Sequence, residues 1–530
     1  MRTERARALA PAVLGLLLGV LALGPALGPG FVLRYDMVFV PDPPLTLPGQ
    51  GFPRAVPSDL VVALLSAVLP EQAVQKAILL GVFVLAASGA AALVPSDRLG
   101  PRLAAAAFYA WNAYLAQRLL LGQWALLLGV AGLPWAVRAA ALGGRLRLVA
   151  ALLPAAAGGF QAMLVSVPAV LATAATAPLP APLPAARVRR VGEAALILGG
   201  LSLPWLVPAL LSAATTDPAG VDAFAARADG PFGVLGSLLG LGGIWNAHAT
   251  VPGQDSWWSA GVRLVLAAVA VRGFVRLRAG ARGAPPYWTG LAAAAGAGLA
   301  VACLGPFAPG PLKALIGWWP GFGPLRDGQL HLASFALLQA VGLGGVAAGP
   351  VPGPGAGPAP SAGGPASRAV AAVAVAVPVL VLPSFALGAF GRLAAVDYPD
   401  EWRRVQAIVN ADPAPGALLS LPWGAHRAFG WNGGRVILDP ASKMFARRTV
   451  WNDELLVGLP DGGRITVAAE DPLVTEVETA LEGRPEDRVR ALAALGVRYV
   501  LVHSGDNAFH GGATVFQGEE LRLLRLGHPR

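Results

Sequence analysis

Cysteine, histidine and charge are all scarce in this chain of 530 residues. Its one cysteine, Cys303, lies in an apolar run, so the chain can form no internal disulfide and no cysteine cluster for a metal. The 6 histidines are scattered without the spacing of a metal site. Charged residues make up 13% of the chain, and no CxxC, HExxH, P-loop, GxSxG or dinucleotide-binding motif stands in a suitable context. These absences exclude most chemistries of soluble enzymes.

Apolar residues are abundant instead, at 55% of the chain with a mean hydropathy of +0.59. Many runs approach about 20 residues, the length of a spanning helix. We therefore predict a polytopic α-helical membrane protein with about eleven transmembrane helices, near 9–29, 73–93, 103–117, 124–137, 148–160, 163–178, 191–212, 259–275, 287–306, 331–348 and 369–390. Runs between 103 and 178 are short and broken by Gly and Pro, so nine spans also fit. The first run is long for a cleavable signal peptide, which favours a retained anchor.

Arginine and lysine are distributed unevenly over the predicted loops. With a cytoplasmic N-terminus, the inner segments hold 16 of these residues and the outer loops hold 6. Because positive residues stay on the cytoplasmic side, this bias predicts a plasma-membrane protein whose part after about residue 391 is exported. The net charge of +10 is then explained by the basic residues of the inner loops, and we expect no nucleic-acid partner.

The composition changes after the last predicted span. Of the 30 acidic residues, 18 lie in 392–530, which we predict to be an exported soluble α/β domain following a transmembrane domain, 1–391. ALLSLPW and RVILDP predict short buried strands, and PEDRVRALAALGVRYVLVHSG predicts a helix, a turn at Gly496 and a strand. The Pro/Gly-rich stretch 349–367 predicts an inner linker. Without a disulfide, the exported domain depends on its own core or on docking to the membrane part.

Polar residues gather in the loops that are predicted to lie outside. FVLRYDMVFVPDPPL, 31–45, is followed by PSDLVVALLSAVLP, which is too short to span and predicts an amphipathic helix in the membrane interface, with Ser58 as its cap. Three further loops carry YAWNAYLAQRLLLGQW, GGIWNAHATVPGQDSWW and GWWPGFGPLRDGQL. The candidate site residues in these loops are Arg34, Asp36, Asp42, Asp59, Arg118, His248, Arg326 and Asp327.

Each candidate also has a structural interpretation. Arg118 can extend toward lipid headgroups, Arg34 and Asp36 can form an exposed salt bridge, and Asp327 can cap a helix. His248 fits a hydrogen-bonded loop residue. The aromatic residues nearby are typical anchors of the membrane interface: Trp257, Trp258, Trp318 and Trp319.

The arrangement resembles the GT-C superfamily of membrane glycosyltransferases. The matching features are Asp36 in LRYDMVF, the helix after Pro57 and the domain after residue 391. PGFGPLRDGQLHLA, YPDEWRRVQAIV, LLSLPWG and LGVRYVLV are similar to segments of the actinobacterial arabinofuranosyltransferase-like and YfhO-like branches. One departure is that Asp36 is followed by Met37, where the superfamily often has a second acid.

The resemblance implies sugar transfer from a polyprenyl-phosphate donor to a cell-envelope glycan acceptor at the outer face. Asp36 is then the general base. Arg326 and Arg118 would hold the departing phosphate, and the other candidates would complete the substrate site. No cofactor is certain, and a divalent cation stays open because the second acid is missing.

Two other classes remain open on the sequence alone. A transporter needs ionisable residues at the middle of the membrane and repeated broken helices, and the span interiors show few charges and no clear repeat. A non-catalytic assembly partner in the cell envelope needs only the exported domain as a binding surface, and the missing second acid favours this class.

Overall fold

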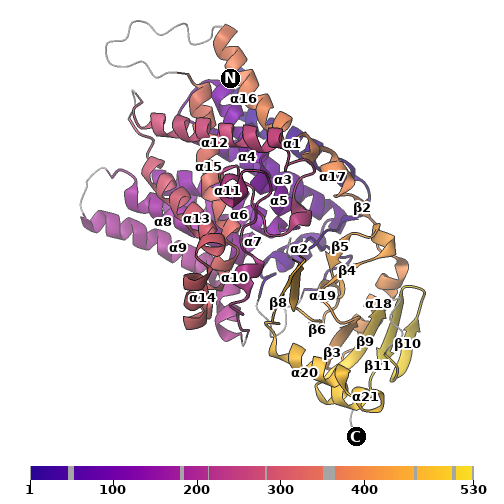
Figure 1. The fold of residues 1–530 in the computed structure, drawn as a ribbon. Helices are drawn as coiled ribbons and strands as arrows, with labels where there is room; N and C mark the ends of the chain where they lie inside the picture. The colour runs from indigo at the N-terminus through magenta and orange to yellow at the C-terminus, as the bar shows by residue number, and fades with distance from the viewer. Residues whose placement is uncertain are drawn as a thin grey trace, which may run out of the picture.

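The computed structural model describes residues 2–45, 53–179, 184–212, 214–280, 283–349, 365–458, 462–503 and 509–527. A bundle of helices forms one part, and a domain containing a β-sheet is attached to one end of it (Figure 1). We call this end of the bundle the domain-facing end.

The bundle consists of long apolar helices joined by short turns at one end and by longer loops at the domain-facing end. Its helices are α1 (Arg2–Leu23), α3 (Glu71–Leu93), α4 (Leu99–Ala110), α5 (Ala113–Leu120), α6 (Trp124–Leu142), α7 (Arg145–Gly158), α8 (Phe160–Thr176), α9 (Pro184–Leu211), α12 (Trp257–Leu277), α13 (Trp288–Phe307), α15 (Ala333–Ala347) and α16 (Pro365–Val381). Shorter helices lie between them: α2 (Ser58–Ser66), α10 (Gly220–Ala223), α11 (Gly233–Leu239), α14 (Pro309–Trp318) and α17 (Ala386–Gly391).

Within the described ranges, six helical segments are long and apolar enough to cross a membrane, and a bent pair around Pro383 would make a seventh. Every predicted span overlaps a helix, but the count of about eleven is not confirmed. Most of the remaining helices are shorter than 18 residues, and α12, which is longer and carries Arg263, Arg272 and Arg276, is not among the six. The predicted span 103–117 is in fact two helices, α4 and α5, separated at Trp111 and Asn112.

Small residues let the helices of the bundle approach closely. At the crossing of α12 and α15, a Cβ atom on Gly273 would overlap the carbonyl of Gly342, and one on Gly342 would overlap the carbonyl of Ala270. Such small-residue contacts drive helix association where lipid leaves no hydrophobic advantage to packing. The bundle is therefore held by shape at these crossings.

The C-terminal domain is built on a five-stranded sheet with strand order β10-β11-β9-β3-β6. Strand β3 runs parallel to both β6 and β9, whereas β11 runs antiparallel to both β9 and β10. The elements are β2 (Ala395–Val396), α18 (Asp400–Ala411), β3 (Ala417–Leu421), β4 (His426–Ala428), β5 (Val436–Leu438), α19 (Ala441–Met444), β6 (Thr449–Val450), β7 (Leu455–Gly458), β8 (Arg464–Val467), α20 (Pro472–Glu482), α21 (Pro485–Ala494), β9 (Val497–His503), β10 (Ala513–Gln517) and β11 (Leu521–Arg525).

The strands and the helix predicted from ALLSLPW, RVILDP and PEDRVRALAALGVRYVLVHSG are confirmed as β3, β5, α21 and β9. Gly496 makes the turn before β9 with φ +82°, a conformation that glycine adopts without strain. Most of the predicted linker 349–367 lies outside the described residues, and α16 already begins at Pro365.

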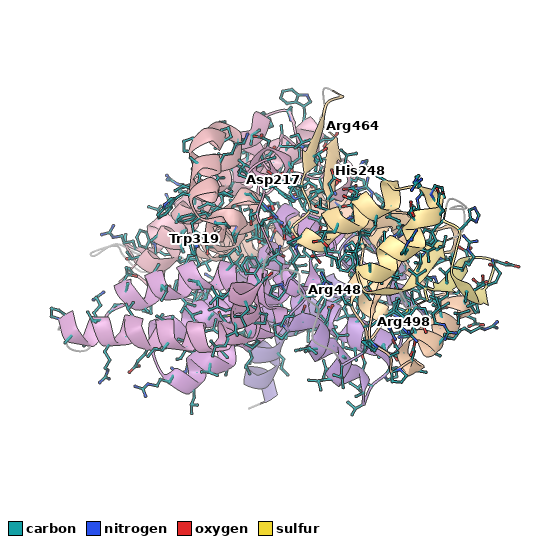
Figure 2. All side chains as sticks on the ribbon, turned by 90° about the horizontal axis from the view of Figure 1, so that it is seen from below. Asp217, His248, Trp319, Arg448, Arg464 and Arg498 are labelled. Atoms are coloured by element: carbon teal, nitrogen blue, oxygen red, sulfur yellow. The ribbon has the colours of Figure 1, made fainter. Side chains whose placement is uncertain are left out.

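The domain docks on the bundle through backbone pairing. Strand β1 (Phe31–Val32), directly after α1, pairs with β2, and Tyr35 exchanges backbone hydrogen bonds with β5. The β7–β8 hairpin packs its apolar side chains against Phe224 and Trp245 of the bundle's loops. Figure 2 shows Asp217 at this junction, where its carboxylate accepts a hydrogen bond from the backbone N–H of Ala468. The C-terminal domain thus has both a hydrophobic core of its own and docking contacts to the bundle.

This docking bears on the predicted orientation. Because the loop after α1 and the C-terminal domain pair through their backbones, both lie on one side of the membrane. We expect alkaline phosphatase, which folds only after export, to be active when fused after Arg530, and green fluorescent protein to be dark there. The same reporters inserted between Gly349 and Pro365 should give the opposite result. Cytoplasmic activity of the Arg530 fusion would contradict the predicted orientation.

Candidate functional site

Asp36 stands at the tip of a tight turn at the domain-facing end. Arg34 and Met37 exchange backbone hydrogen bonds of 3.1 and 2.9 Å, and Tyr35 between them has φ +45°. The turn buries Met37 and leaves the Asp36 side chain 50% exposed. The sequence therefore directs a single carboxylate out of an otherwise buried loop.

Helix α5 and the turn after it fix the position of Asp36. The Asp36 N–H donates to the carbonyl of Leu121 at 3.3 Å. Gly122 follows with φ +84°, and a Cβ there would overlap the Arg34 carbonyl and the Met37 nitrogen. A close approach of this kind requires glycine. The backbone around Asp36 is thus set by the C-terminal end of α5.

The C-terminal domain contributes a histidine to the same place. Nε2 of His426, the first residue of β4, lies 3.6 Å from Oδ1 of Asp36. Strand β5, which pairs with β4, carries the backbone partners of Tyr35. The carboxylate therefore lies at the seam between the bundle and the domain.

Arg118, on α5, is fully buried and uses four of its five N–H donors in hydrogen bonds to side chains. Its Nη1 and Nη2 atoms form a two-pronged ion pair with Asp327, at 2.6 and 2.8 Å. Nη1 also donates to Gln123 and Nε donates to Gln329, each at 2.7 Å. Arg118 therefore neither extends to lipid headgroups nor presents a free fork to a ligand.

Asp327 was also a candidate helix cap. Its side chain forms no cap hydrogen bond with the segment that it precedes, and it pairs with Arg118 instead. The N-terminus of α5 has a true cap, since the Asn112 side chain accepts from the Leu115 N–H at 3.0 Å. At the same helix, Gln117 donates to buried Asp229 at 2.7 Å. Polar contacts on all sides thus hold α5 beneath Asp36.

Arg326 joins the bundle to the C-terminal domain. Its Nη2 donates to Oε1 of Glu470 at 2.8 Å, and its guanidinium lies over the ring of Phe224, 4.9 Å from the centroid. On the same carboxylate, Oε2 of Glu470 pairs with Arg54 at 2.6 Å. Two arginines from different loops therefore converge on one acid.

Charges link this cluster to Asp36. Desolvation opposes the charge of Arg54, but the carboxylates of Glu470, Asp453 and Asp36 raise its pKa. Burial likewise disfavours ionised Glu470, and Arg54 followed by Arg326 outweighs it and lowers the pKa of Glu470. Arg54 thus lies within electrostatic reach of both Glu470 and Asp36.

Arg34 and His248 meet, but away from the Asp36 carboxylate. Arg34 is buried and donates to the carbonyls of Leu120 and His248 at 3.0 and 2.9 Å. The alternative of an exposed Arg34–Asp36 salt bridge is therefore wrong, because the turn at Tyr35 sends the two side chains apart. His248 contributes its backbone, and its side chain is exposed.

Asp42 and Asp59 serve the docking of the domain. The carbonyl of Asp42 accepts from Gln406 of α18 at 3.0 Å, and Asp59 pairs with Lys443 of α19 at 3.0 Å. Asp59 lies in the first turn of the predicted interfacial helix, α2. The expected Ser58 cap is wrong: Pro57 occupies that position, and the Ser58 hydroxyl donates to the carbonyl of Ala55.

Trp257, Trp258, Trp318 and Trp319 are largely exposed at the ends of apolar helices. Exposed tryptophan at a helix end is typical of an anchor in the membrane interface. The exposed Leu64 and Val68, within and just after α2, fit the same boundary.

The described residues do not fit a divalent cation. Among them, no group of three or more His, Cys, Asp or Glu side chains is arranged to hold a metal ion. Both carboxylate oxygens of Glu470 are bound by arginines. Among the described residues, His426 is the one side chain that lies within 4 Å of the Asp36 carboxylate as an ionic partner.

Sequence analysis missed Arg54, His426 and Glu470. Arg54 is one of the 6 basic residues in the predicted outer loops, and no motif surrounds His426 or Glu470. His426 and Glu470 lie several hundred residues after Asp36, and the docked domain brings them to the loops of the bundle, His426 to Asp36 and Glu470 to Arg54 and Arg326. A basic residue in the same loop as the candidate base was the single available signal.

Comparison with known proteins supports the fold. No protein-family model and no curated protein matches the chain in sequence. Among solved structures, the chain is similar to the arabinofuranosyltransferase AftD from Mycobacteria, with a TM-score of 0.52, 16% identity and 99% of this chain covered. A mutant of AftD gives a TM-score of 0.55 at 15% identity. The match covers 40% of the AftD chain in the first case and 42% in the second.

These matches confirm the fold that was expected from the sequence: a part made of apolar helices followed by a C-terminal sheet domain, as in AftD. At such low identity they establish the fold alone. The chain also spans less than half of AftD, so the activity of that enzyme is not carried over.

Proposed function

We propose that this protein is a membrane glycosyltransferase that moves a sugar from a polyprenyl-phosphate donor to a cell-envelope acceptor on the outer face of the plasma membrane. The observation that carries the proposal is Asp36: a half-exposed carboxylate on a turn that the backbone holds, beside His426 where the bundle meets the C-terminal domain. The GT-C-like fold shared with an arabinofuranosyltransferase supports it.

Asp36 is suited to take a proton from the acceptor hydroxyl. Its backbone is fixed by Leu121 and Gly122. Its carboxylate has one ionic partner among the described residues, His426 at 3.6 Å. A general base needs this combination of a fixed position and an accessible oxygen. The acceptor oxygen then forms the new glycosidic bond, and the bond between the sugar carbon and the phosphate oxygen breaks.

Arginine is suited to hold the departing phosphate, because its planar fork matches phosphate oxygens. Of the two arginines named from the sequence, Arg118 already gives four hydrogen bonds to Asp327, Gln123 and Gln329. Arg326 has a buried Nη1 without a hydrogen-bond partner among the described residues. The structure therefore favours Arg326 for this role and leaves Arg118 to support α5.

The proposal can be tested through lipids that remain on the purified protein. We expect mass spectrometry to detect a polyprenyl phosphate with the wild type. Arg326→Lys keeps the charge but loses the two-pronged geometry, so the retained amount should fall several-fold, and Arg326→Ala should lose more. Arg464, on the exposed edge of β8, offers a matched control: Arg464→Lys should retain the wild-type amount.

Equal polyprenyl phosphate in the wild type, Arg326→Lys and Arg326→Ala would remove Arg326 from the site. Absence of the lipid from every preparation, together with absence of sugar transfer in membranes, would contradict the transferase and favour an assembly partner. Net movement of the lipid across vesicles without transfer would favour a transporter.

A further inference from the structure

Glu470 lies where an anionic ligand of the two arginines would lie. Each of its carboxylate oxygens accepts from a different guanidinium, with Arg54 at 2.6 Å and Arg326 at 2.8 Å. The arginines come from separate loops of the bundle, and Glu470 comes from the segment between β8 and α20 of the C-terminal domain. One acid therefore fills a site built by two cations.

The two arginines of this cluster can bind a ligand that carries more negative charge than one carboxylate does. Arg54 and Arg326 carry two positive charges, and both bind the carboxylate of Glu470, whose pKa they lower despite its burial. Burial raises the pKa of the neighbouring Asp453, Arg54 opposes that shift, and Glu470 adds to it. The site thus stabilises an anion placed between the arginines.

The side chain of Glu470 can leave without moving its backbone. Its N–H donates to Asp453 at 3.3 Å, and its carbonyl accepts from the N–H of Thr215 at 3.2 Å. These two bonds hold the chain, whereas the carboxylate depends on the arginines alone among the described residues. The Arg54 side chain is 58% exposed, so a ligand can reach it from solvent.

We propose that Arg54 and Arg326 form a phosphate-binding site that the Glu470 side chain occupies when no phosphate is bound. A phosphate group offers more oxygens and more negative charge to the two forks than a carboxylate does, so it replaces Glu470 by exchange. The ligand class is a phosphate ester. Its identity as the lipid phosphate released by sugar transfer rests on the proposed function.

Exchange predicts that removing the charge of Glu470 strengthens phosphate binding. With purified full-length protein and farnesyl phosphate as the probe, we expect Glu470→Gln to bind about tenfold more tightly than the wild type, since a charge-assisted bond no longer competes. Adding Arg54→Ala to Glu470→Gln should abolish the gain. Glu476→Gln, on the exposed face of α20, should bind like the wild type.

Farnesol and inorganic phosphate separate the sources of the ligand. A gain with farnesyl phosphate, a smaller gain with inorganic phosphate and none with farnesol supports a lipid phosphate. A gain confined to inorganic phosphate overturns the lipid and leaves a free-phosphate site. If folded Glu470→Gln binds farnesyl phosphate and inorganic phosphate no more tightly than the wild type, the exchange is overturned. Glu470 then only holds the C-terminal domain to the bundle through its two ion pairs.

A folding defect is distinguished by a second variant. Glu470→Asp keeps a negative charge beside the arginines but reaches them less well, so it should lose less stability than Glu470→Gln and still bind farnesyl phosphate more tightly than the wild type. If its affinity does not rise, the exchange is overturned. None of these readouts requires turnover, so a failed exchange is separable from a failed transferase, which is tested at Asp36.

Discussion

Replacing Asp36 by asparagine should lower the rate of sugar transfer by about 10²–10⁴-fold, the usual contribution of a general base. Asparagine keeps the size of the side chain but cannot take the acceptor proton. The backbone bonds that fix residue 36 come from Leu121 and from the turn between Arg34 and Met37, and neither depends on the carboxylate. The variant should therefore express and unfold like the wild type. Transfer in isolated membranes and complementation of a deletion strain measure the loss.

Asp42→Asn and Asp59→Asn test whether the base is correctly placed within the loop. Asp42 is exposed beside α18, and Asp59 pairs with Lys443, so both variants should keep most of the activity. If Asp36→Asn stays fully active and one of the others does not, the base lies elsewhere in the same loop. If all three stay active, the assembly-partner hypothesis replaces the transferase.

Local signals carried much of the fold. Apolar runs located the helices because a run of this length has no other stable place than a membrane or a buried bundle. The strands around ALLSLPW and LGVRYVLV were found because they are short, apolar and bounded by turn residues. The number of spans is not confirmed, and one predicted span is broken into two helices at Trp111 and Asn112, because hydropathy averages over such a break.

The candidate site likewise has features that could be predicted from the sequence and features that could not. Asp36 could be named from one loop, and the structure places it at the domain-facing end with Arg118 beneath it and Arg326 at the same seam. What a guanidinium binds could not be predicted, because it depends on docking. Arg118 and Arg326 look alike in sequence, yet Arg118 pairs with Asp327 within the bundle and Arg326 pairs with Glu470 of the C-terminal domain.

Arg118→Ala should destabilise the protein by about 3–5 kcal/mol, the cost of removing one partner from a buried ion pair. Asp327 would lose both prongs of its pair, and Gln123 and Gln329 would each lose a donor. Arg118→Lys should fail in nearly the same way, because an ammonium group cannot reach these partners together. A lower unfolding temperature of the purified protein measures the loss, with Arg490→Ala on exposed α21 as the control.

A paired substitution separates support from ligand binding at Arg118. Replacing both members by apolar residues, Arg118→Met with Asp327→Leu, leaves neither charge alone, and such replacements are often close to neutral for stability. If Arg118 only holds α5 beneath Asp36, the double variant should recover both its unfolding temperature and its binding of farnesyl phosphate. Recovery of stability without recovery of binding would mean that Arg118 touches the phosphate itself, as its sequence context first indicated. Arg118 would then share with Arg326 the task of holding the leaving group.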